Sequence, residues 1–484
     1  MVQKRDLKRL SDYLYEIPTS LRSDMRVPAR IYADDKLLEM ALEDRAVEQL
    51  VNTTTLPGIV RYALAMPDIH QGYGFSIGGV AATKLPDGVI SPGGVGYDIN
   101  CGVRLLASNL TRDEVAPHVG ALMNAVYRRV PSGVGQGGAL KLSERDMDEV
   151  LERGASWVVD KLGYGTREDL ERTEERGSMA GGEARHVSKQ ARDRARGQLG
   201  TLGSGNHFLE IDQVVEIYDQ AAADAYGLYP GRIAVQIHSG SRALGHQVCT
   251  DYVRRLQQAA AQYGIKLPDR ELACVPFDSP EGKAYFGAMV CAANYAWANR
   301  QVMAHQVRQA FDDVLAGKVN RRELSMVYDV AHNIAKVETY PVEGQPTRLC
   351  VHRKGATRSL GPGGQGLPDA YREIGQPVLI PGSMGTASYV LAGTRKAMEE
   401  SFGSTCHGAG RVLSRQSAKR QVRGDELRAE LERQGIAVRA GSMPGLAEEA
   451  PDAYKDIDLV VEVVHGAGLS RKVARLEPLG VMKG

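Results

Sequence analysis

A carboxylate and a thiol stand three residues apart in a glycine-flanked segment, residues 94–102, where Asp98 precedes Cys101. Both side chains could reach one metal ion from a single turn. Taken alone, the segment fits a simpler structure better. In that structure Asp98 accepts backbone hydrogen bonds in a tight turn, and Cys101 packs as a small apolar residue.

Three of the chain's 11 histidines follow a glycine turn or an apolar, strand-like run: His207, His238 and His332. A single histidine in such a setting is usually structural. Together with Asp98 and Cys101, the three give five candidate ligands. That number is enough for two metal ions if the thiolate bridges them.

A fourth histidine, His407, precedes the run Gly408-Ala409-Gly410, which Arg411 follows. Backbone amides of such a run can bind phosphate oxygens, and an arginine can clamp them. An imidazole nitrogen is also a competent nucleophile towards phosphorus. The alternative is a helix-start turn with an incidental histidine, and the residues alone favour neither.

Two further glycine-rich runs bear on nucleotide binding. Residues 381–388 (PGSMGTAS) are a second candidate anion site, or an ordinary polar turn. Residues 133–138 match GxGxxG, but the preceding residues have helical spacing and Pro131 intervenes, so we exclude a dinucleotide site there. Since the chain has no Walker A motif, any nucleotide would be bound by other means.

Charge is balanced over the 484 residues: 60 Lys and Arg against 59 Asp and Glu give a net charge of +1. The total therefore gives no electrostatic argument for nucleic acid or membrane. Basic residues do cluster locally, at Arg185, His186, Lys189, Arg192, Arg194 and Arg196, and at Arg353, Lys354 and Arg358. The first run is either a solvated helix face or a track for a phosphate backbone that leads towards His207.

The six cysteines form no CxxC pair, and the charged start of the chain has no apolar stretch typical of a signal peptide. The longest weakly polar run, residues 287–298, is shorter than a membrane span of about 20 residues. We expect a reduced, cytoplasmic protein with no membrane segment.

Several elements can be predicted to position these residues. Helical spacing or capping predicts helices over 35–51, from Pro280 to about Leu315, and over 425–434 before Gly435. Short apolar runs predict strands at 79–82, 103–107, 233–237 and 459–464. Because the order shows no regular βαβ spacing, we expect a single large α+β domain over 1–484. Its mixed sheets would be surrounded by helices, with an active-site cleft lined by glycine-rich turns. The densely charged residues 165–196 are expected to form a surface excursion.

Eight blocks in this order resemble the RtcB family of RNA ligases. They are MPDIHQGYGFSIGG (66–79), GGVGYDINCGVRLL (93–106), GTLGSGNHFLE (200–210), IHSGSRALG (237–245), YDVAHN (328–333), HRKGATRS (352–359), PGSMGTASY (381–389) and STCHGAGR (404–411). The resemblance covers nearly the whole chain. Ser76 stands where the family more often has proline, and residues 165–196 match no block.

The resemblance implies an enzyme that joins RNA 3′-phosphate or 2′,3′-cyclic phosphate ends to 5′-hydroxyl ends, in tRNA splicing, RNA repair or both. It implies GTP and two manganese ions per site. A guanylylated histidine, by its motif His407, would pass GMP to the RNA 3′-phosphate. The 5′-hydroxyl would then attack the RNA-3′-pp-G intermediate and release GMP. The family often works with archease as an activator.

By resemblance, Asp98, Cys101 and His207 hold one metal, and Cys101, His238 and His332 hold the second. The implied guanylate pocket consists of Asn206, His207, Phe208, Leu209, Glu210, His332, Asn333, Pro381, Gly382, Ser383, Met384, Ser388, His407, Gly408, Ala409, Gly410, Tyr454 and Lys483. Tyr454 is expected to stack on the base, and Glu210 to accept hydrogen bonds from guanine. Arg242 and Arg411 are expected to clamp phosphates.

A thiolate with three imidazoles is a soft donor set that favours zinc or cobalt over manganese. We expect manganese in function, with zinc or cobalt able to occupy the site and inhibit. Two other functions use the same residues. A dinuclear metal phosphodiesterase would open cyclic phosphates without any nucleotide, but it has no need of the His407 motif. A non-catalytic RNA-binding protein would use residues 185–196, but it has no need of five metal-type ligands.

Overall fold

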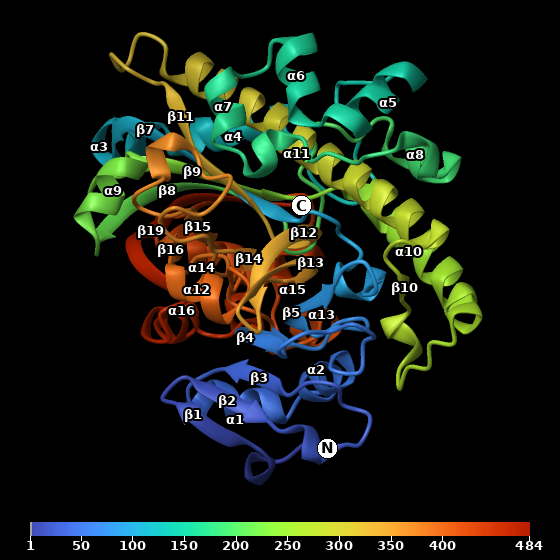
Figure 1. Cartoon of the computed structure of the whole chain (residues 1–484). Coiled ribbons are helices and arrows are strands. Elements are labelled where there is room, and N and C mark those ends of the chain that lie inside the picture. Colours follow the sequence, from blue (N-terminus) through green and yellow to red (C-terminus); the bar gives the residue numbers. More distant parts are fainter. Residues whose placement is uncertain (1) are drawn as a thin grey trace.

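Two large mixed β-sheets form the centre of the structure, a computed structural model that describes residues 2–484 (Figure 1). In the first sheet the order is β1 (Lys8–Ser11), β2 (Leu14–Ile17), β3 (Ala29–Tyr32), β4 (Ala63–His70), β5 (Ile77–Lys84), β13 (Gln345–Lys354) and β12 (Asn333–Val342). Its strands are antiparallel except for the β3–β4 pair.

The second sheet has the order β11 (Leu324–Ala331), β7 (Gly102–Thr111), β9 (Arg232–Ser239), β8 (Phe208–Ile217), β19 (Ser470–Lys483), β16 (Ser388–Gly393) and β15 (Pro377–Ile380). A further strand, β18 (Ala437–Ala440), pairs in parallel with β19. Two short pairs complete the described strands: β6 (Val89–Ile90) with β10 (Val275–Pro276), and β14 (Thr357–Arg358) with β17 (Ser404–Thr405). The predicted α+β fold with mixed sheets is confirmed.

Helices surround these sheets, and many of those from the middle of the chain gather on one side (Figure 1). The described α-helices are α1 (Asp35–Leu42), α2 (Ala46–Thr53), α3 (Arg112–Val115), α4 (Val119–Arg129), α5 (Glu144–Arg153), α6 (Ala155–Leu162), α7 (Arg167–Glu171), α8 (Lys189–Ala195), α9 (Gln220–Tyr226), α10 (Arg242–Ala259), α11 (Pro280–Leu315), α12 (Arg395–Glu400), α13 (Arg415–Gln421), α14 (Gly424–Arg433), α15 (Met443–Glu448) and α16 (Ile457–Gly466). Among residues 2–484, no helix has the length and apolar character needed to cross a membrane.

The longest helix, α11, follows its predicted bounds. The Ser279 side chain accepts a hydrogen bond from the Gly282 amide at 3.1 Å, and Pro280 occupies the first turn. The helix is buried along most of its length and runs diagonally across the helical layer (Figure 1). It forms the support of the candidate site described below. The helix predicted over 425–434 is confirmed as α14, and strands at 79–82, 103–107 and 233–237 are confirmed as parts of β5, β7 and β9.

Two predicted elements are wrong. The helix expected over 35–51 is two helices. In one uninterrupted helix, Asp44 and Arg45 would lie on the same face as the buried Leu37 and Leu38, and that face packs against the core. A break between α1 and α2 turns Val47 and Leu50 back towards the core. The strand expected over 459–464 lies in α16, since the Asp456 side chain caps a helix there. A short apolar run does not distinguish a buried strand from a buried helix.

Residues 165–196 are not a surface excursion. Asp169 and Glu174 are 2% and 1% exposed and pair with cations from elsewhere in the chain. Arg308 of α11 binds both oxygens of Asp169 at 2.6 and 2.7 Å, and Lys336 of β12 binds Glu174 at 2.5 Å. Two acids of this charged segment therefore form buried ion pairs, a use of charge that composition does not reveal.

Candidate active site

Strand register brings the candidate metal ligands together at one end of neighbouring strands of the second sheet. Gly102, the first residue of β7, pairs with Ser239 at the end of β9 and with Ala331 at the end of β11. Phe208, the first residue of β8, pairs with His238. Residues that precede or follow these strand ends therefore converge, although as many as 234 positions separate Asp98 from His332 in the sequence.

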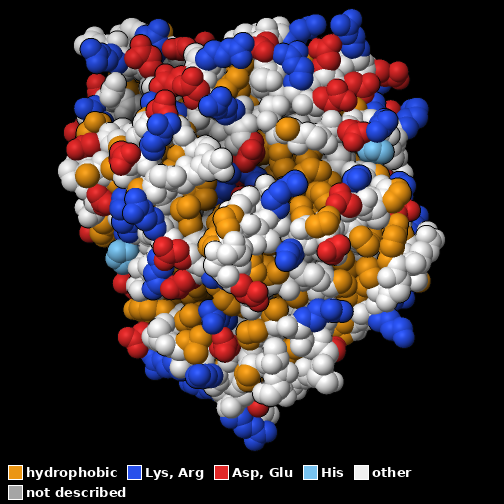
Figure 2. All heavy atoms as spheres, in the orientation of Figure 1, with side chains coloured by type: hydrophobic (Ala, Val, Ile, Leu, Met, Phe, Trp, Pro, Cys, Tyr) orange, Lys and Arg blue, Asp and Glu red, His pale blue; other side chains and the backbone are white. Residues whose placement is uncertain are grey.

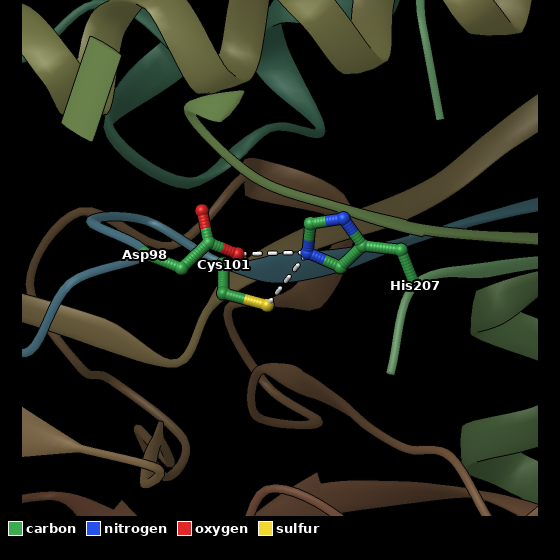
Figure 3. Close-up of side chains that lie close together, drawn as sticks. All are labelled: Asp98, Cys101 and His207. Atoms are coloured by element: carbon green, nitrogen blue, oxygen red, sulfur yellow. Dashed lines mark hydrogen bonds and ion pairs between the residues drawn. The ribbon is translucent and has the colours of Figure 1, made fainter. Parts of the chain in front are cut away.

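Asp98, Cys101 and His207 point towards one another and form the tightest ligand group (Figure 3). Their ligand atoms all lie within 4.8 Å of one another. Asp98 Oδ2 is 2.7 Å from His207 Nε2, and Cys101 Sγ is 3.5 Å from the same nitrogen. This is the first metal set expected from the sequence.

His207 has a hydrogen-bonding pattern that fits a cation. Its Nδ1 lies 3.0 Å from the Leu202 carbonyl oxygen, which can only accept, so Nδ1 carries the proton. If Nε2 is unprotonated, its lone pair faces the Asp98 carboxylate, an arrangement of two acceptors. Either a proton or a metal ion between the two atoms removes this conflict, and a carboxylate, a thiol and an imidazole grouped this closely fit a divalent metal.

The second set is looser. Cys101 Sγ lies 3.2 Å from His238 Nε2, while the His238 and His332 ring centroids are 5.6 Å apart. Thr357 Oγ1 lies 2.9 Å from His332 Nδ1, and His332 Nε2 is buried with no hydrogen-bond partner. Within residues 2–484, Asp98, Cys101 and His207 are the one set of three such side chains whose ligand atoms lie this close together. His332 lies near His238 but outside the group formed by Asp98, Cys101 and His207.

Burial sets the protonation of these groups. It lowers the pKa of His238 and His332 well below the usual range, so both imidazoles are neutral, as metal ligands must be. Burial, reinforced by Asp98, raises the pKa of the Cys101 thiol well above its usual value. Burial also acts to raise the pKa of Asp98, but His207, Cys101 and Arg242 together lower it. A bound cation would favour the Cys101 thiolate.

Helix α11 supports these strand ends with buried polar side chains that the sequence analysis did not single out. Arg300 Nη1 donates to the Asn100 and Ser239 carbonyl oxygens, both at 2.8 Å, and these residues adjoin Cys101 and His238. Its Nε and Nη2 bind the two oxygens of Asp329 at 2.9 and 2.8 Å. The available signal was a run of polar residues, 299–301, in an otherwise alanine-rich helix.

Close backbone approach explains one glycine of the site. A Cβ at Gly240 would lie 2.4 Å from Asp98 Oδ1, so any side chain there would displace the Asp98 carboxylate from its place beside His207. Asn100 in that turn has a φ of +51°, a conformation that L-residues rarely adopt. Its amide is fixed by hydrogen bonds to α11, with Nδ2 donating to the Ala293 carbonyl at 2.8 Å.

His407 is oriented by a buried carboxylate that the sequence analysis did not assign. Asp68 Oδ2 lies 2.5 Å from His407 Nδ1 and accepts from the His407 and Gly408 backbone amides at 2.9 and 3.3 Å. Burial acts to raise the pKa of Asp68, but His407 and its hydrogen bonds lower it. With Nδ1 bound, His407 Nε2 is the free ring nitrogen, and the ring centroid lies 5.4 Å from that of His332. Asp68 belongs to the block at 66–79, and its place in that block was the one signal available.

A cavity of about 350 Å³ connects these groups. Among its lining residues are the expected site residues Asp98, Cys101, Asn206, Phe208, His238, His332, Asn333, Pro381, Gly382, Ser383, Met384, His407, Gly408, Ala409, Gly410, Arg411, Tyr454 and Lys483. The cavity wall is therefore built of glycine-rich turns and strand ends, as the sequence predicts.

Other expected pocket residues do not line this cavity. Leu209 is fully buried in the core on the other face of β8 from Phe208, because side chains alternate along a strand. Glu210 is 3% exposed, and burial together with Asp212 raises the pKa of its carboxyl well above the usual value. Ser388 Oγ instead accepts from the Gly382 amide at 3.1 Å and so fixes the turn that does line the cavity.

The two expected phosphate clamps are held by protein groups. Arg411 donates to Tyr454 Oη at 3.0 Å and to Glu449 Oε1 at 3.1 Å, and its guanidinium carbon lies 4.9 Å from the Tyr454 ring centroid. Arg242 donates from Nε to Thr201 Oγ1 at 3.1 Å and does not line the cavity. Arg415 lines the cavity and was not predicted.

The basic run over 185–196 is largely paired with acids. Its cations include Arg185, Lys189, Arg192 and Arg196, whose partners are Glu183, Asp193, Asp148 and Glu144. Figure 2 shows the same mixture on one face of the molecule, where basic and acidic side chains alternate. Arg194 differs, because its Nη1 donates to the Gln247 amide oxygen of α10 at 2.7 Å.

The cavity of this α+β fold brings a group of metal-type ligands close to a histidine that a carboxylate orients. Such a site is suited to phosphoryl chemistry. A family model described as tRNA-splicing ligase RtcB matches residues 49–484. The chain is 56% identical to a tRNA-splicing ligase RtcB of Archaeoglobus fulgidus and 55% identical to one of Thermococcus kodakarensis, each over 99% of both chains. It is 54% identical to an RNA-splicing ligase RtcB of Mycobacterium bovis, over 90% of this chain and all of the relative. The chain therefore belongs to the RtcB family of RNA ligases, as its motifs predicted.

Proposed function

We propose that this protein joins RNA 3′-phosphate or 2′,3′-cyclic phosphate ends to 5′-hydroxyl ends, in tRNA splicing, RNA repair or both, and that it uses GTP and manganese. The observation that carries the proposal is the pair Asp68–His407 beside the metal-type ligands in one cavity. A phosphodiesterase would need the ligands but not an oriented nucleophilic histidine.

His407 would act as the nucleophile. Because Nδ1–H donates to Asp68, Nε2 carries the lone pair that attacks the α-phosphorus of GTP. The new P–N bond forms as the bond to pyrophosphate breaks, and Asp68 stabilises the positive charge that develops on the ring. The neutral form of the ring is the one that attacks, so no proton leaves Nε2 in this step.

Two transfers then follow. An oxygen of the RNA 3′-phosphate attacks the phosphorus of the bound GMP, the P–N bond breaks, and RNA-3′-pp-G forms. The RNA 5′-hydroxyl attacks the 3′-phosphorus, loses its proton and displaces GMP. A cyclic phosphate end must first be opened by water to the 3′-phosphate.

Asp98, Cys101 and His207 would hold one divalent cation, with Cys101, His238 and His332 towards a second. Such a cation supplies Lewis-acid stabilisation of the phosphate oxygens. The soft donor set supports binding of zinc or cobalt as well, so both should compete with manganese.

The guanylate would lie between the 381–384 and 408–410 turns, against Tyr454 and Lys483. Lys483 lies 3.6 Å from Glu449 and donates to the Gly205 carbonyl at 3.4 Å. Arg411 holds Tyr454 in place rather than a phosphate, because most of its donors are already bound to Glu449, Tyr454 and backbone carbonyls. Archease is proposed as an activating partner on the resemblance alone.

The test is incubation with α-phosphate-labelled GTP and manganese in the absence of RNA, followed by denaturing electrophoresis. The wild-type protein should retain label in an acid-labile, alkali-stable bond, as expected of a phosphoramidate. His407→Ala should not be labelled, yet it should join an RNA that already carries the 3′-pp-G end. Label that persists in His407→Ala, or opening of cyclic phosphate without any labelling of the wild type, would refute the proposal.

A further inference from the structure

Two tyrosines of the cavity wall and one neighbouring histidine have no role in the metal or guanylate sites. Tyr73 and Tyr97 line the cavity, and the Tyr97 ring centroid lies 4.9 Å from that of His246, with an angle of 33° between the planes. Tyr73 meets Tyr97 edge to face at 5.5 Å. The two tyrosines are half-buried and His246 is exposed. We call these three residues the aromatic platform.

Tyr73, one ring of the platform, is fixed in place from several elements. The Tyr73 carbonyl accepts from Lys354 Nζ of β13, and Gln257 Nε2 of α10 donates to Tyr73 Oη at 3.4 Å. The next residue, Gly74, donates its amide to Glu271 Oε2 at 3.0 Å. Tyr97 packs against this fixed ring and against His246, and a ring held between neighbours loses less conformational entropy when a ligand binds.

The platform adjoins groups suited to nucleic acid. Tyr97 directly precedes the expected metal ligand Asp98, and His246 lies one helical turn after Arg242 on α10. The neighbouring Gln247 accepts from Arg194 Nη1 at 2.7 Å. Aromatic rings interspersed with cations are the usual surface for single-stranded nucleic acid, because every base has a face that can stack.

Tyr454, the ring expected to meet guanine, is held elsewhere in the cavity by Arg411, four residues after His407. The cavity thus offers two separate aromatic surfaces, and the guanylate needs one of them. The proposed reaction must also place RNA ends beside the metal ligands, where Tyr97 lies.

We propose that Tyr97, backed by His246 and braced by Tyr73, is a stacking subsite for an unpaired terminal nucleobase of the RNA. The inference rests on the proposed function, since it takes RNA ends as the substrate. Both the 3′-phosphate end and the 5′-hydroxyl end carry such a base, so the test examines them separately.

The test compares RNA ends with and without the terminal base. An abasic nucleotide is placed at the 3′-phosphate end of one strand, or at the 5′-hydroxyl end of the other, and the binding of each strand is measured. Wild-type protein should bind the strand that uses the subsite roughly 5- to 150-fold more weakly when its base is missing. Tyr97→Leu should bind that strand equally with or without the base, while the matched control Tyr97→Phe should retain the discrimination.

A second readout does not depend on the variants. 2-Aminopurine at the terminal position should lose fluorescence on binding to the wild-type protein, as a stacked base does. Equal affinity of the wild type for intact and abasic strands at both ends would overturn the inference, as would equal discrimination by Tyr97→Leu and Tyr97→Phe. Failure of the proposed function would appear differently, as a wild-type protein that forms no adduct with GTP. The binding measurements would still decide the subsite in that case.

Discussion

Replacing Asp68 by Asn tests whether His407 is activated by its buried carboxylate. Asp68 Oδ2 accepts three hydrogen bonds, from His407 Nδ1 and from the His407 and Gly408 amides. The Asn oxygen can keep these bonds, so the ring should remain in place. The negative charge is lost, however, and in the proposed reaction the ring becomes more positive as its Nε2 attacks phosphorus.

The size of the effect follows from the charge separation. Unit charges about 4 Å apart attract by about 4 kcal/mol at an effective dielectric constant of about 20. If about half a charge develops on the ring in the transition state, Asp68 contributes about 2 kcal/mol, which is about 30-fold in rate. The Asn amide nitrogen would take the position of Oδ1, which is buried with no hydrogen-bond partner. An unsatisfied buried donor also costs about 1–3 kcal/mol of stability.

The assay is the single-turnover rate of labelled GMP transfer to the protein at saturating GTP and manganese, with His407→Ala as the zero baseline. Thermal unfolding and metal content of Asp68→Asn are measured alongside, so that a folding defect is recognised. A well-folded Asp68→Asn protein that is guanylylated within about threefold of the wild-type rate would refute the electrostatic role of Asp68.

Three further outcomes are expected. Cys101→Ser should fold but bind less metal, measured by elemental analysis, and should not join RNA; normal metal content with full activity would remove Cys101 from the ligand set. Arg300→Met should lower the free energy of unfolding by about 3 kcal/mol. This is the lower end of the range for breaking a buried ion pair, because Arg104 still binds Asp329. A denaturant titration curve that matches the wild type would contradict this expectation. Lys336 and Arg358 lower the pKa of Glu175 to about 2, below its ordinary 4.5, so its stabilising effect is complete above about pH 4.5 and is lost as the pH falls towards 2. Glu175→Gln should therefore be less stable than wild type at pH 7, with a gap that narrows below pH 4.5; a gap that stays constant down to pH 3 would show that the charge is not responsible.

The sequence predictions that the structure confirms were based on residue types and their local spacing. Ser279 and Pro280 predicted the start of α11 because capping is a local interaction between a side chain and the nearest amides. The blocks around Cys101 and His407 predicted the family because each side chain has a chemical role that few residue types can fill. Local patterns failed for residues 459–464, where an apolar run is compatible with either a strand or a helix.

What surrounds each of these residues was decided by tertiary structure. The register of β7, β8, β9 and β11 places Asp98, Cys101 and His207 within reach of one ion, and no local pattern encodes pairing between strands so far apart in sequence. The partners Asp68 and Arg300 were missed for the same reason, since a buried charge is identified by the group it meets. The sequence identified the candidate metal ligands and the candidate nucleophile, and long-range packing alone determined their neighbours and their burial.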